Sequence, residues 1–304
     1  MEKRKTKWKG VFTAIVTPFL PSGEIDWKSY RELLKAQKTG KVAGVIPCGT
    51  TGESPTLTQE EKKKLITVTL EELKGSGLKV VAGTGSNSTA ETVELSSWAS
   101  DQGVDGVLIV VPYYNKPSQA GLISHFTQVA DRVKCDVILY NVPSRTVAAL
   151  TAETIAQLAH HPRIAAIKEA TGNLAFDSEI IEALRLEKIE FALLSGDDLT
   201  FLPFLALGGD GVISVASNLI PAELVELQAQ FEKGNLSRAR EIHEKYFQVF
   251  KDLFFEPSPA PAKYALSLTG VCSTAVRSPI TELSDAGVER LNATLKRAGL
   301  LERK

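Results

Sequence analysis

Short apolar segments that alternate with helix-like segments constrain the fold of this 304-residue chain more than any other feature. A polar turn and then a stretch with the period of an amphipathic helix follow each apolar segment. Parallel strands need a crossover connection, usually a helix, so the alternation predicts a parallel sheet. The eight candidate strands begin at residues 10, 42, 79, 106, 136, 164, 191 and 211.

Eight strand–helix units favour a closed (β/α)8 barrel, the TIM-barrel class of α/β fold, over an open doubly wound sheet. No G-x-G-x-x-G turn follows the first candidate strand, as it would in an open dinucleotide-binding sheet. Thr58 and Ser88 precede two helical segments with acidic residues in the first turn, so we expect both to be N-caps. From residue 221 the pattern is helical only, which predicts a catalytic barrel over 1–230 and a C-terminal helical domain over 231–304.

Charge and cysteine usage narrow the class of partner and the compartment. Thirty-five Lys and Arg against 36 Asp and Glu give a net charge of -1, so we expect a small-molecule partner, not nucleic acid or a membrane. Cys48, Cys135 and Cys272 are far apart and lack C-x-x-C spacing, which argues against a disulfide framework or a zinc site. The basic N-terminus precedes no apolar signal or membrane-spanning segment, so we predict a cytoplasmic protein.

A lysine near the end of an apolar segment, "IAAIKEAT" from residue 164, is the first candidate for catalysis. In barrels of this class the active site lies at the carboxyl ends of the strands. Residues two apart share one face of a strand, so Ala166 and Ala170 would leave room around the Lys168 amine. A partly desolvated amine is neutral more often and can form a Schiff base with a carbonyl substrate. The alternatives are a lysine that extends to solvent or one that pairs with Asp197.

The turn "CGTTGES", residues 48–54, follows the second candidate strand. Its backbone N–H groups can bind a carboxylate, and Thr50 or Thr51 can add a hydroxyl donor. A tight turn that needs only the conformational freedom of glycine is the alternative. Together with Lys168, the turn suggests a pocket for a 2-oxo acid, with the amine at the ketone and the amides at the carboxylate.

Tyrosines and an arginine follow the fourth and fifth candidate strands. Schiff-base chemistry moves protons, and Thr50, Tyr140 and a second tyrosine, Tyr113 or Tyr114, can carry them. A tyrosine that only packs is the alternative for each. Arg145 is either a surface residue or a clamp for the carboxylate of a second substrate. The four histidines fall in helical segments, so we expect no metal site, and we expect no cofactor.

Eight motifs in order along the chain resemble the 4-hydroxy-tetrahydrodipicolinate synthase (dihydrodipicolinate synthase) family of the N-acetylneuraminate lyase superfamily. They are "GVFTAIVTPF", "CGTTGES", "AGTGSN", "PYYNKPSQ", "LYNVPSRT", "IKEATGN", "LLSGDD" and "GVISVASN". The resemblance implies a (β/α)8 barrel with a C-terminal helical domain, and a homotetramer built from two tight dimers. It also implies the condensation of pyruvate with L-aspartate 4-semialdehyde, the first committed step of lysine biosynthesis through diaminopimelate.

The resemblance implies roles for single residues. Lys168 would form the Schiff base with pyruvate. The proton relay would consist of Thr50, Tyr140 and Tyr114, with Tyr114 entering the site of the neighbouring subunit. Dimerisation would then be part of catalysis.

Substrate contacts are implied in the same way. Thr51 would bind the carboxylate of pyruvate and Arg145 that of the semialdehyde, while Gly196 and Ile213 would line the pocket. Arg145 after "NVPS" favours the synthase over lyases that act on sugar acids. Val147 stands where the family generally has glycine.

Feedback inhibition by lysine is predicted to be weak or absent. Four residues match the lysine site of inhibited members of the family: Ser54, Asn87, Glu91 and Tyr113. Gln59 and Lys62 replace histidines of the inhibited enzymes, and a cation at Lys62 would oppose a cationic effector.

Two other functions stay open at this point. A sibling enzyme could use the same Schiff base to cleave N-acetylneuraminate or 2-keto-3-deoxy-gluconate. A catalytically silent barrel could bind a ligand only, although Lys168, Tyr140 and Thr50 argue against it.

Overall fold

The computed structural model describes residues 6–301 and contains one closed parallel barrel, with strands in the order β1 to β8. All eight predicted strands are present, so the predicted TIM-barrel fold is confirmed. The strands are β1 Gly10–Ala14, β2 Gly44–Ile46, β3 Lys79–Gly83, β4 Gly106–Val110, β5 Asp136–Asn141, β6 Ile164–Glu169, β7 Ala192–Ser195 and β8 Gly211–Ser214.

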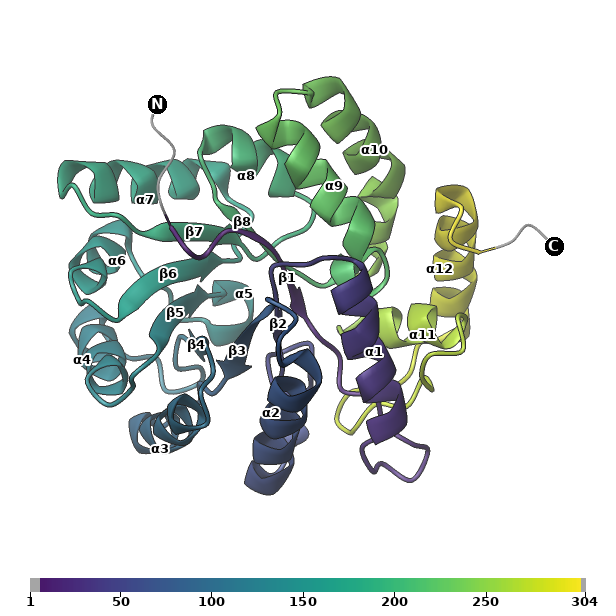
Figure 1. Ribbon diagram of the computed structural model, residues 1–304, viewed down its shortest axis with the longest axis horizontal. Helices are drawn as coiled ribbons and strands as arrows, with labels where there is room; N and C mark the ends of the chain where they lie inside the picture. The colour runs from purple at the N-terminus through teal and green to yellow at the C-terminus, as the bar shows by residue number, and fades with distance from the viewer. Residues whose placement is uncertain (1–5, 302–304) are drawn as a thin grey trace. The chain divides into compact units, whose positions relative to one another are not determined.

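Helices alternate with the strands and continue beyond the last one (Figure 1). The first eight are α1 Trp27–Thr39, α2 Gln59–Leu73, α3 Thr89–Asp101, α4 Gln119–Ala130, α5 Pro143–Thr146, α6 Ala152–Ala159, α7 Leu174–Leu186 and α8 Phe201–Leu207. The C-terminal helices are α9 Pro221–Glu232, α10 Leu236–Asp252, α11 Ala260–Ser267 and α12 Asp285–Ala298, and short 3-10 turns are η1 Ser54–Thr56 and η2 Ala216–Asn218. The helical C-terminal extension is therefore confirmed, while the domain boundary at residue 230, which falls inside α9, stays a prediction.

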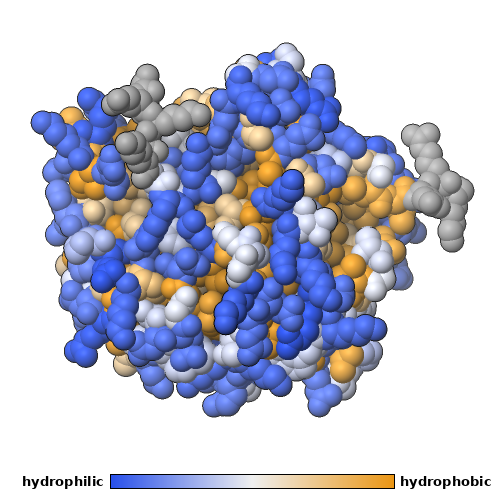
Figure 2. Space-filling model, in the orientation of Figure 1, coloured by the Kyte–Doolittle hydropathy of each residue, from blue (hydrophilic) through white to orange (hydrophobic). Residues whose placement is uncertain are grey.

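Side-chain caps explain where α2 and α3 begin. The Thr58 hydroxyl accepts a hydrogen bond from the Glu61 N–H, and the Glu61 carboxylate accepts one from the Thr58 N–H, which is a capping box. At the start of α3, the Ser88 hydroxyl accepts a hydrogen bond from the Glu91 N–H. Both predicted N-caps are confirmed. The outward face of α2 is hydrophilic (Figure 2), whereas Leu65 and Leu73 on its other face are buried.

The chain divides into two compact units. The first comprises residues 6–10 and Lys79–Ile213, and the second comprises Val11–Leu78 and residues 214–301. In the first unit β3 to β8 pair in parallel, each with the next strand along the chain, and α4, α6 and α7 lie outside β4 to β7 (Figure 1). In the second unit β1 pairs with β2, with Phe12 opposite Gly44.

The register in the first unit sets the positions of the candidate catalytic residues. Tyr140 pairs with Lys168, and the next pair along the two strands joins Asn141 to Glu169. Both pairs lie at the carboxyl ends of their strands, the edge at which barrels of this class carry their active sites. No helix in the described part of the chain has the length and apolar character needed to cross a membrane.

Candidate active site

Lys168 is buried at the carboxyl end of β6, with 5% of its surface exposed. Its Nζ lies 4.2 Å from the centroid of the Tyr140 ring, which is within cation–π distance. The Asp197 carboxylate accepts hydrogen bonds from the Leu199 N–H and the Thr200 hydroxyl. Among residues 6–301 we find no ion pair between Lys168 and a carboxylate. The structure therefore favours neither a solvent-extended lysine nor a pair with Asp197.

Small residues make room around the Lys168 side chain. Gly196 follows β7, and a Cβ added there would lie 3.0 Å from the Lys168 Cε and 2.5 Å from the Ala170 Cβ. Ala166, two residues before Lys168 on β6, is fully buried. Ile213 on β8 is also buried, and the described register pairs its neighbour Val212 with Ser195.

Tyr140 differs sharply in exposure from Tyr114. Tyr140 is buried at the end of β5, with 5% of its surface exposed, whereas Tyr114 is 88% exposed. Tyr114 has a φ of 73°, a conformation that costs energy for a bulky residue. Next to it, the Asn115 side chain donates a hydrogen bond to the Asn87 carbonyl, which holds this turn against the segment after β3. The Tyr114 side chain thus faces solvent in the single chain.

Two buried carboxyl groups, Glu169 on β6 and Asp177 on α7, were not predicted from the sequence. Glu169 accepts hydrogen bonds from the Asn141 amide (3.0 Å) and from the N–H and hydroxyl of Thr171 (3.0 and 2.6 Å). Asp177, in the first turn of α7, is 3% exposed. Burial and then the charges of Glu169 and Asp197 raise the pKa of Asp177 to about 7, and burial raises the pKa of Glu169. The helical period of α7 gave no signal that Asp177 faces a second carboxylate.

Arg145 lies in the one-turn helix α5 and is exposed. The buried Thr146 side chain donates to the Val142 and Ala148 carbonyls, and the Val147 N–H donates to the Pro143 carbonyl. Val147 has a φ of 65° and a ψ of -44°. A β-branched residue is strained at positive φ, which gives a physical reason for the glycine expected here.

The turn that contains Thr50 and Thr51 belongs to the second unit. The N–H groups of Gly52 and Glu53 donate to the Gly49 and Thr50 carbonyls, and the Thr17 hydroxyl donates to the Gly52 carbonyl. The N–H groups of Thr50 and Thr51 are outside these turn bonds. Thr51 is 4% exposed and Thr50 is half-buried.

A buried ion pair supports the end of this turn. The Lys263 Nζ lies 2.5 Å from the Glu53 carboxylate, and both side chains are fully buried. The Arg277 N–H donates to the other Glu53 oxygen, while the Arg277 guanidinium pairs with Glu61. Desolvation lowers the pKa of Lys263, against the opposing effect of Glu53. Sequence reasoning missed this pair because 210 residues separate its members.

All three cysteines are free. Cys48, the first residue of the 48–54 turn that contains Thr50, has a φ of 59°. Burial raises the pKa of the Cys48 thiol to about 12 and that of Cys272 to about 11. The raised pKa values keep both thiols mostly protonated at neutral pH, and the thiolate is the reactive form.

The residues that match a lysine site belong to both units. In the first unit Asn87 and Tyr113 are half-buried, and the exposed Glu91 accepts a hydrogen bond from the Ser86 hydroxyl. In the second unit Ser54 begins η1. Gln59 and Lys62, which replace the expected histidines, lie in the first turn of α2.

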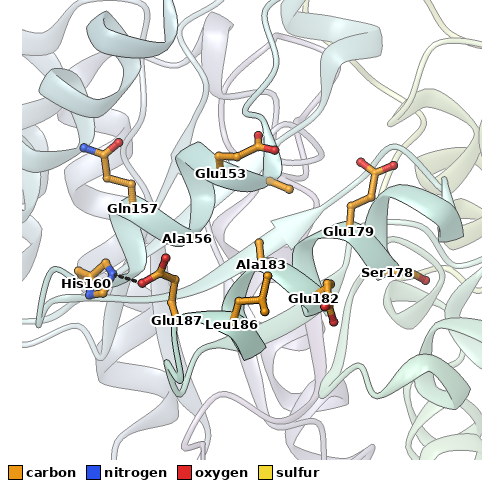
Figure 3. Close-up of a pocket in the computed structure, with 11 residues that line it drawn as sticks. Glu153, Ala156, Gln157, His160, Ser178, Glu179, Glu182, Ala183, Leu186 and Glu187 are labelled. Carbon is orange, nitrogen blue, oxygen red and sulfur yellow. Dashed lines mark ion pairs between the residues drawn. The ribbon is translucent and has the colours of Figure 1, made fainter.

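A groove of about 770 Å³ lies between α6 and α7, outside the predicted site. Figure 3 shows Glu153, Gln157 and His160 on one side of it and Glu179, Glu182 and Glu187 on the other. His160 and Glu187 form an exposed ion pair with an N–O distance of 3.4 Å. The residues that line the groove include none of those predicted from the sequence.

The comparisons with known proteins decide the family. The model of the dihydrodipicolinate synthetase family matches residues 7–298. The chain belongs to this family. A family relative, the 4-hydroxy-tetrahydrodipicolinate synthase of Leptospira biflexa, is 48% identical over 91% of this chain and 93% of its own length.

Solved structures of the dihydrodipicolinate synthase family are also similar. The dihydrodipicolinate synthase of Thermotoga maritima superposes with a TM-score of 0.94 at 41% identity, over 97% of this chain and 100% of its own. The chloride-inhibited dihydrodipicolinate synthase of Acinetobacter baumannii, complexed with pyruvate, gives a TM-score of 0.92 at 38% identity, over 96% and 99% of the two chains. The family membership expected from the motifs is confirmed.

Proposed function

We propose that this chain is a 4-hydroxy-tetrahydrodipicolinate synthase in which Lys168 forms a Schiff base with pyruvate. The observation that carries the proposal is the buried Lys168 amine beside Tyr140 at the carboxyl ends of two paired strands. The complex of the Acinetobacter relative with pyruvate supports the choice of 2-oxo acid.

The reaction follows from the chemistry of an amine with a 2-oxo acid. The neutral Lys168 amine adds to the ketone of pyruvate, and the resulting carbinolamine loses water to give the Schiff base. Loss of a proton from the methyl group gives an enamine, which attacks the aldehyde carbon of L-aspartate 4-semialdehyde. The amino group of the semialdehyde then displaces Lys168 as the ring closes, which returns the free amine.

Each proton transfer needs a donor or an acceptor near the reacting atoms. Tyr140 and Thr50 carry protons in this proposal, and Tyr114 completes the relay from a neighbouring subunit. The 88% exposure of Tyr114 supports that role, since the residue is free to enter another chain.

The substrate contacts of the proposal come from four residues. Thr51 binds the carboxylate of pyruvate, and Gly196 and Ile213 line the pocket. Arg145 binds the carboxylate of the semialdehyde, for which a planar guanidinium is well suited.

Assembly, location and regulation complete the proposal. The enzyme is a cytoplasmic homotetramer built from two dimers, and the exposed Tyr114 makes the dimer the smallest active form. Lysine inhibits weakly or not at all, because the Lys62 ammonium group repels a cationic effector.

Borohydride reduction in the presence of pyruvate tests the proposed function. Mass spectrometry of the digested protein should find a reduced pyruvyl adduct on the peptide that contains Lys168. Steady-state assays should then show condensation of pyruvate with L-aspartate 4-semialdehyde, and little cleavage of N-acetylneuraminate or 2-keto-3-deoxy-gluconate. An unmodified Lys168 would refute the mechanism, and a preference for a sugar acid would refute the choice of substrate.

A further inference from the structure

The side chain of Asn141 joins two segments of the candidate site. Asn141 is the last residue of β5 and is fully buried. Its amide group donates a hydrogen bond to the Glu169 carboxylate (3.0 Å), and its amide oxygen accepts one from the Leu150 N–H (3.0 Å). The Asn141 side chain therefore donates a hydrogen bond to β6 and accepts one from the end of the segment that carries Arg145.

Glu169, the partner of this side chain, is buried and makes further hydrogen bonds. It follows Lys168 directly on β6, and its carboxylate also accepts from the N–H and hydroxyl of Thr171. The backbone of β6 is tied to the same strand end, because the Ala170 N–H donates to the Asn141 carbonyl (3.0 Å). Movement of Asn141 relative to Lys168 would break both the side-chain hydrogen bond to Glu169 and the backbone hydrogen bond from Ala170.

Leu150 closes the segment that begins at Pro143 and includes Arg145. Hydrogen bonds within the segment fix its bend, since the Val147 N–H donates to the Pro143 carbonyl and the Thr146 hydroxyl to the Ala148 carbonyl. The Arg145 side chain is exposed, so the path of this backbone determines where its guanidinium can reach.

We infer that Asn141 is a positioning residue that fixes the Arg145 segment relative to the strand that carries Lys168. The second substrate has a carboxylate at one end and an aldehyde at the other, so both ends must meet the protein at a set separation. Asn141 provides that separation through Glu169 on one side and Leu150 on the other. The inference rests on the proposed function, because it assumes that Arg145 binds the second substrate.

The chemistry of position 141 makes the inference specific. The residue there must supply one donor and one acceptor in a fully buried space, which an asparagine does. An ionised aspartate has the same shape but offers acceptors only, and it would face the Glu169 carboxylate. The bond to Glu169 would be replaced by repulsion, while the bond from Leu150 would remain available.

The substitution Asn141→Asp tests the inference. We expect the Michaelis constant for L-aspartate 4-semialdehyde to rise about tenfold or more. The rate at which the pyruvyl adduct forms at Lys168 should change less than about twofold. Asn235→Asp is the matched control, because Asn235 is an exposed N-cap at which aspartate caps equally well, and neither constant should change there. Equal losses for both substrates would mean a structural role and would overturn the inference.

A double-mutant cycle gives a second, independent test. If Asn141 acts through Arg145, then Asn141→Asp should add little to the defect of Arg145→Ala, and multiplicative effects would overturn the inference. Asn141→Ser replaces Asn141→Asp in both experiments if the aspartate variant does not fold. The natural protein distinguishes failure of the inference from failure of the proposed function. If the natural protein forms no pyruvyl adduct at Lys168, the proposed function is refuted. If it forms the adduct normally but the variants keep the natural Michaelis constant for the semialdehyde, only the inference is refuted.

Discussion

The Lys168 Nζ lies 4.2 Å from the centroid of the Tyr140 ring, and the two residues are direct register partners on β6 and β5. The ring therefore packs on the amine through its face, while the hydroxyl is a separate group that extends beyond the ring. This arrangement allows the packing role of Tyr140 to be separated from its proposed chemical role.

Replacement of Tyr140 by phenylalanine should keep the packing and remove the chemistry. We expect the turnover number to fall by about 100-fold or more, which is the usual contribution of a positioned proton donor or acceptor. The melting temperature should stay close to that of the natural protein, because the buried ring remains. Steady-state kinetics and thermal unfolding of Tyr140→Phe measure the two effects, and a variant with full activity would show that Tyr140 only packs.

Asp177→Asn should make the protein more stable at alkaline pH. The pKa of Asp177 is raised from 3.8 to about 7 in the folded chain. Between these two pH values Asp177 is protonated in the folded chain and ionised in the unfolded chain. The natural protein therefore loses stability as the pH rises from about 4 to 7, by up to about 1.4 kcal/mol per pH unit. The asparagine keeps a donor toward Glu169 without ionising.

Denaturant unfolding at pH 5 and at pH 8 measures this difference. The advantage of Asp177→Asn should be larger at pH 8 than at pH 5. Asp101→Asn is the control, because Asp101 lies in an exposed pair with Lys134 and its replacement should not measurably change the free energy of unfolding. An advantage that grows toward acid pH would contradict the raised pKa.

Val147→Gly should stabilise the fold, as denaturant unfolding can measure. A non-glycine residue held at positive φ destabilises the folded chain by about 1–3 kcal/mol. Glycine removes that strain, but it loses more conformational entropy on folding, which costs about 0.5–1 kcal/mol. Val147 is 66% exposed, so little packing is lost. We expect a net gain of about 1 kcal/mol in the free energy of unfolding. Val147→Ala, which keeps the positive φ but removes the branch, should fall between the two, and a less stable glycine variant would contradict the strain.

Lys263→Met should destabilise the protein strongly. Removal of the lysine leaves the Glu53 carboxylate buried without its ion-pair partner, which costs about 3–5 kcal/mol in comparable sites. The paired change Lys263→Met with Glu53→Gln should recover part of that loss. Denaturant unfolding measures both variants, and Lys134→Met, which breaks an exposed pair, serves as the control with no measurable change expected. Equal stability of the single and double variants would show that the charges are not coupled.

The fold and part of the site were predictable because they depend on local patterns. The alternation of apolar and helical segments predicted the positions of all eight strands. The side chains of Thr58 and Ser88 predicted where α2 and α3 begin. The position of Lys168 at the carboxyl end of a barrel strand was predictable from the same alternation, and that end is where barrels of this class carry their active sites.

The remaining features depend on contacts between distant residues. Asn141 and Glu169 are 28 residues apart, and each looks like an ordinary polar residue at a strand end. The pKa of Asp177 is raised by burial and then by the charges of Glu169 and Asp197, which only the fold brings close. The positive φ of Val147 is a backbone property that its side chain disfavours, so the sequence argues against it.

The burial of Cys48 gives the Thr50 turn a built-in chemical reporter. A thiol-specific alkylating reagent reacts with the thiolate, and the raised pKa of Cys48 keeps that form scarce while the turn is closed. The rate of alkylation at Cys48 in native buffer, followed by peptide mass, therefore measures how often this turn opens. If added pyruvate slows the alkylation of Cys48, the alkylation rate reports how much of the ligand is bound at the turn. This measurement needs no assay of enzyme turnover.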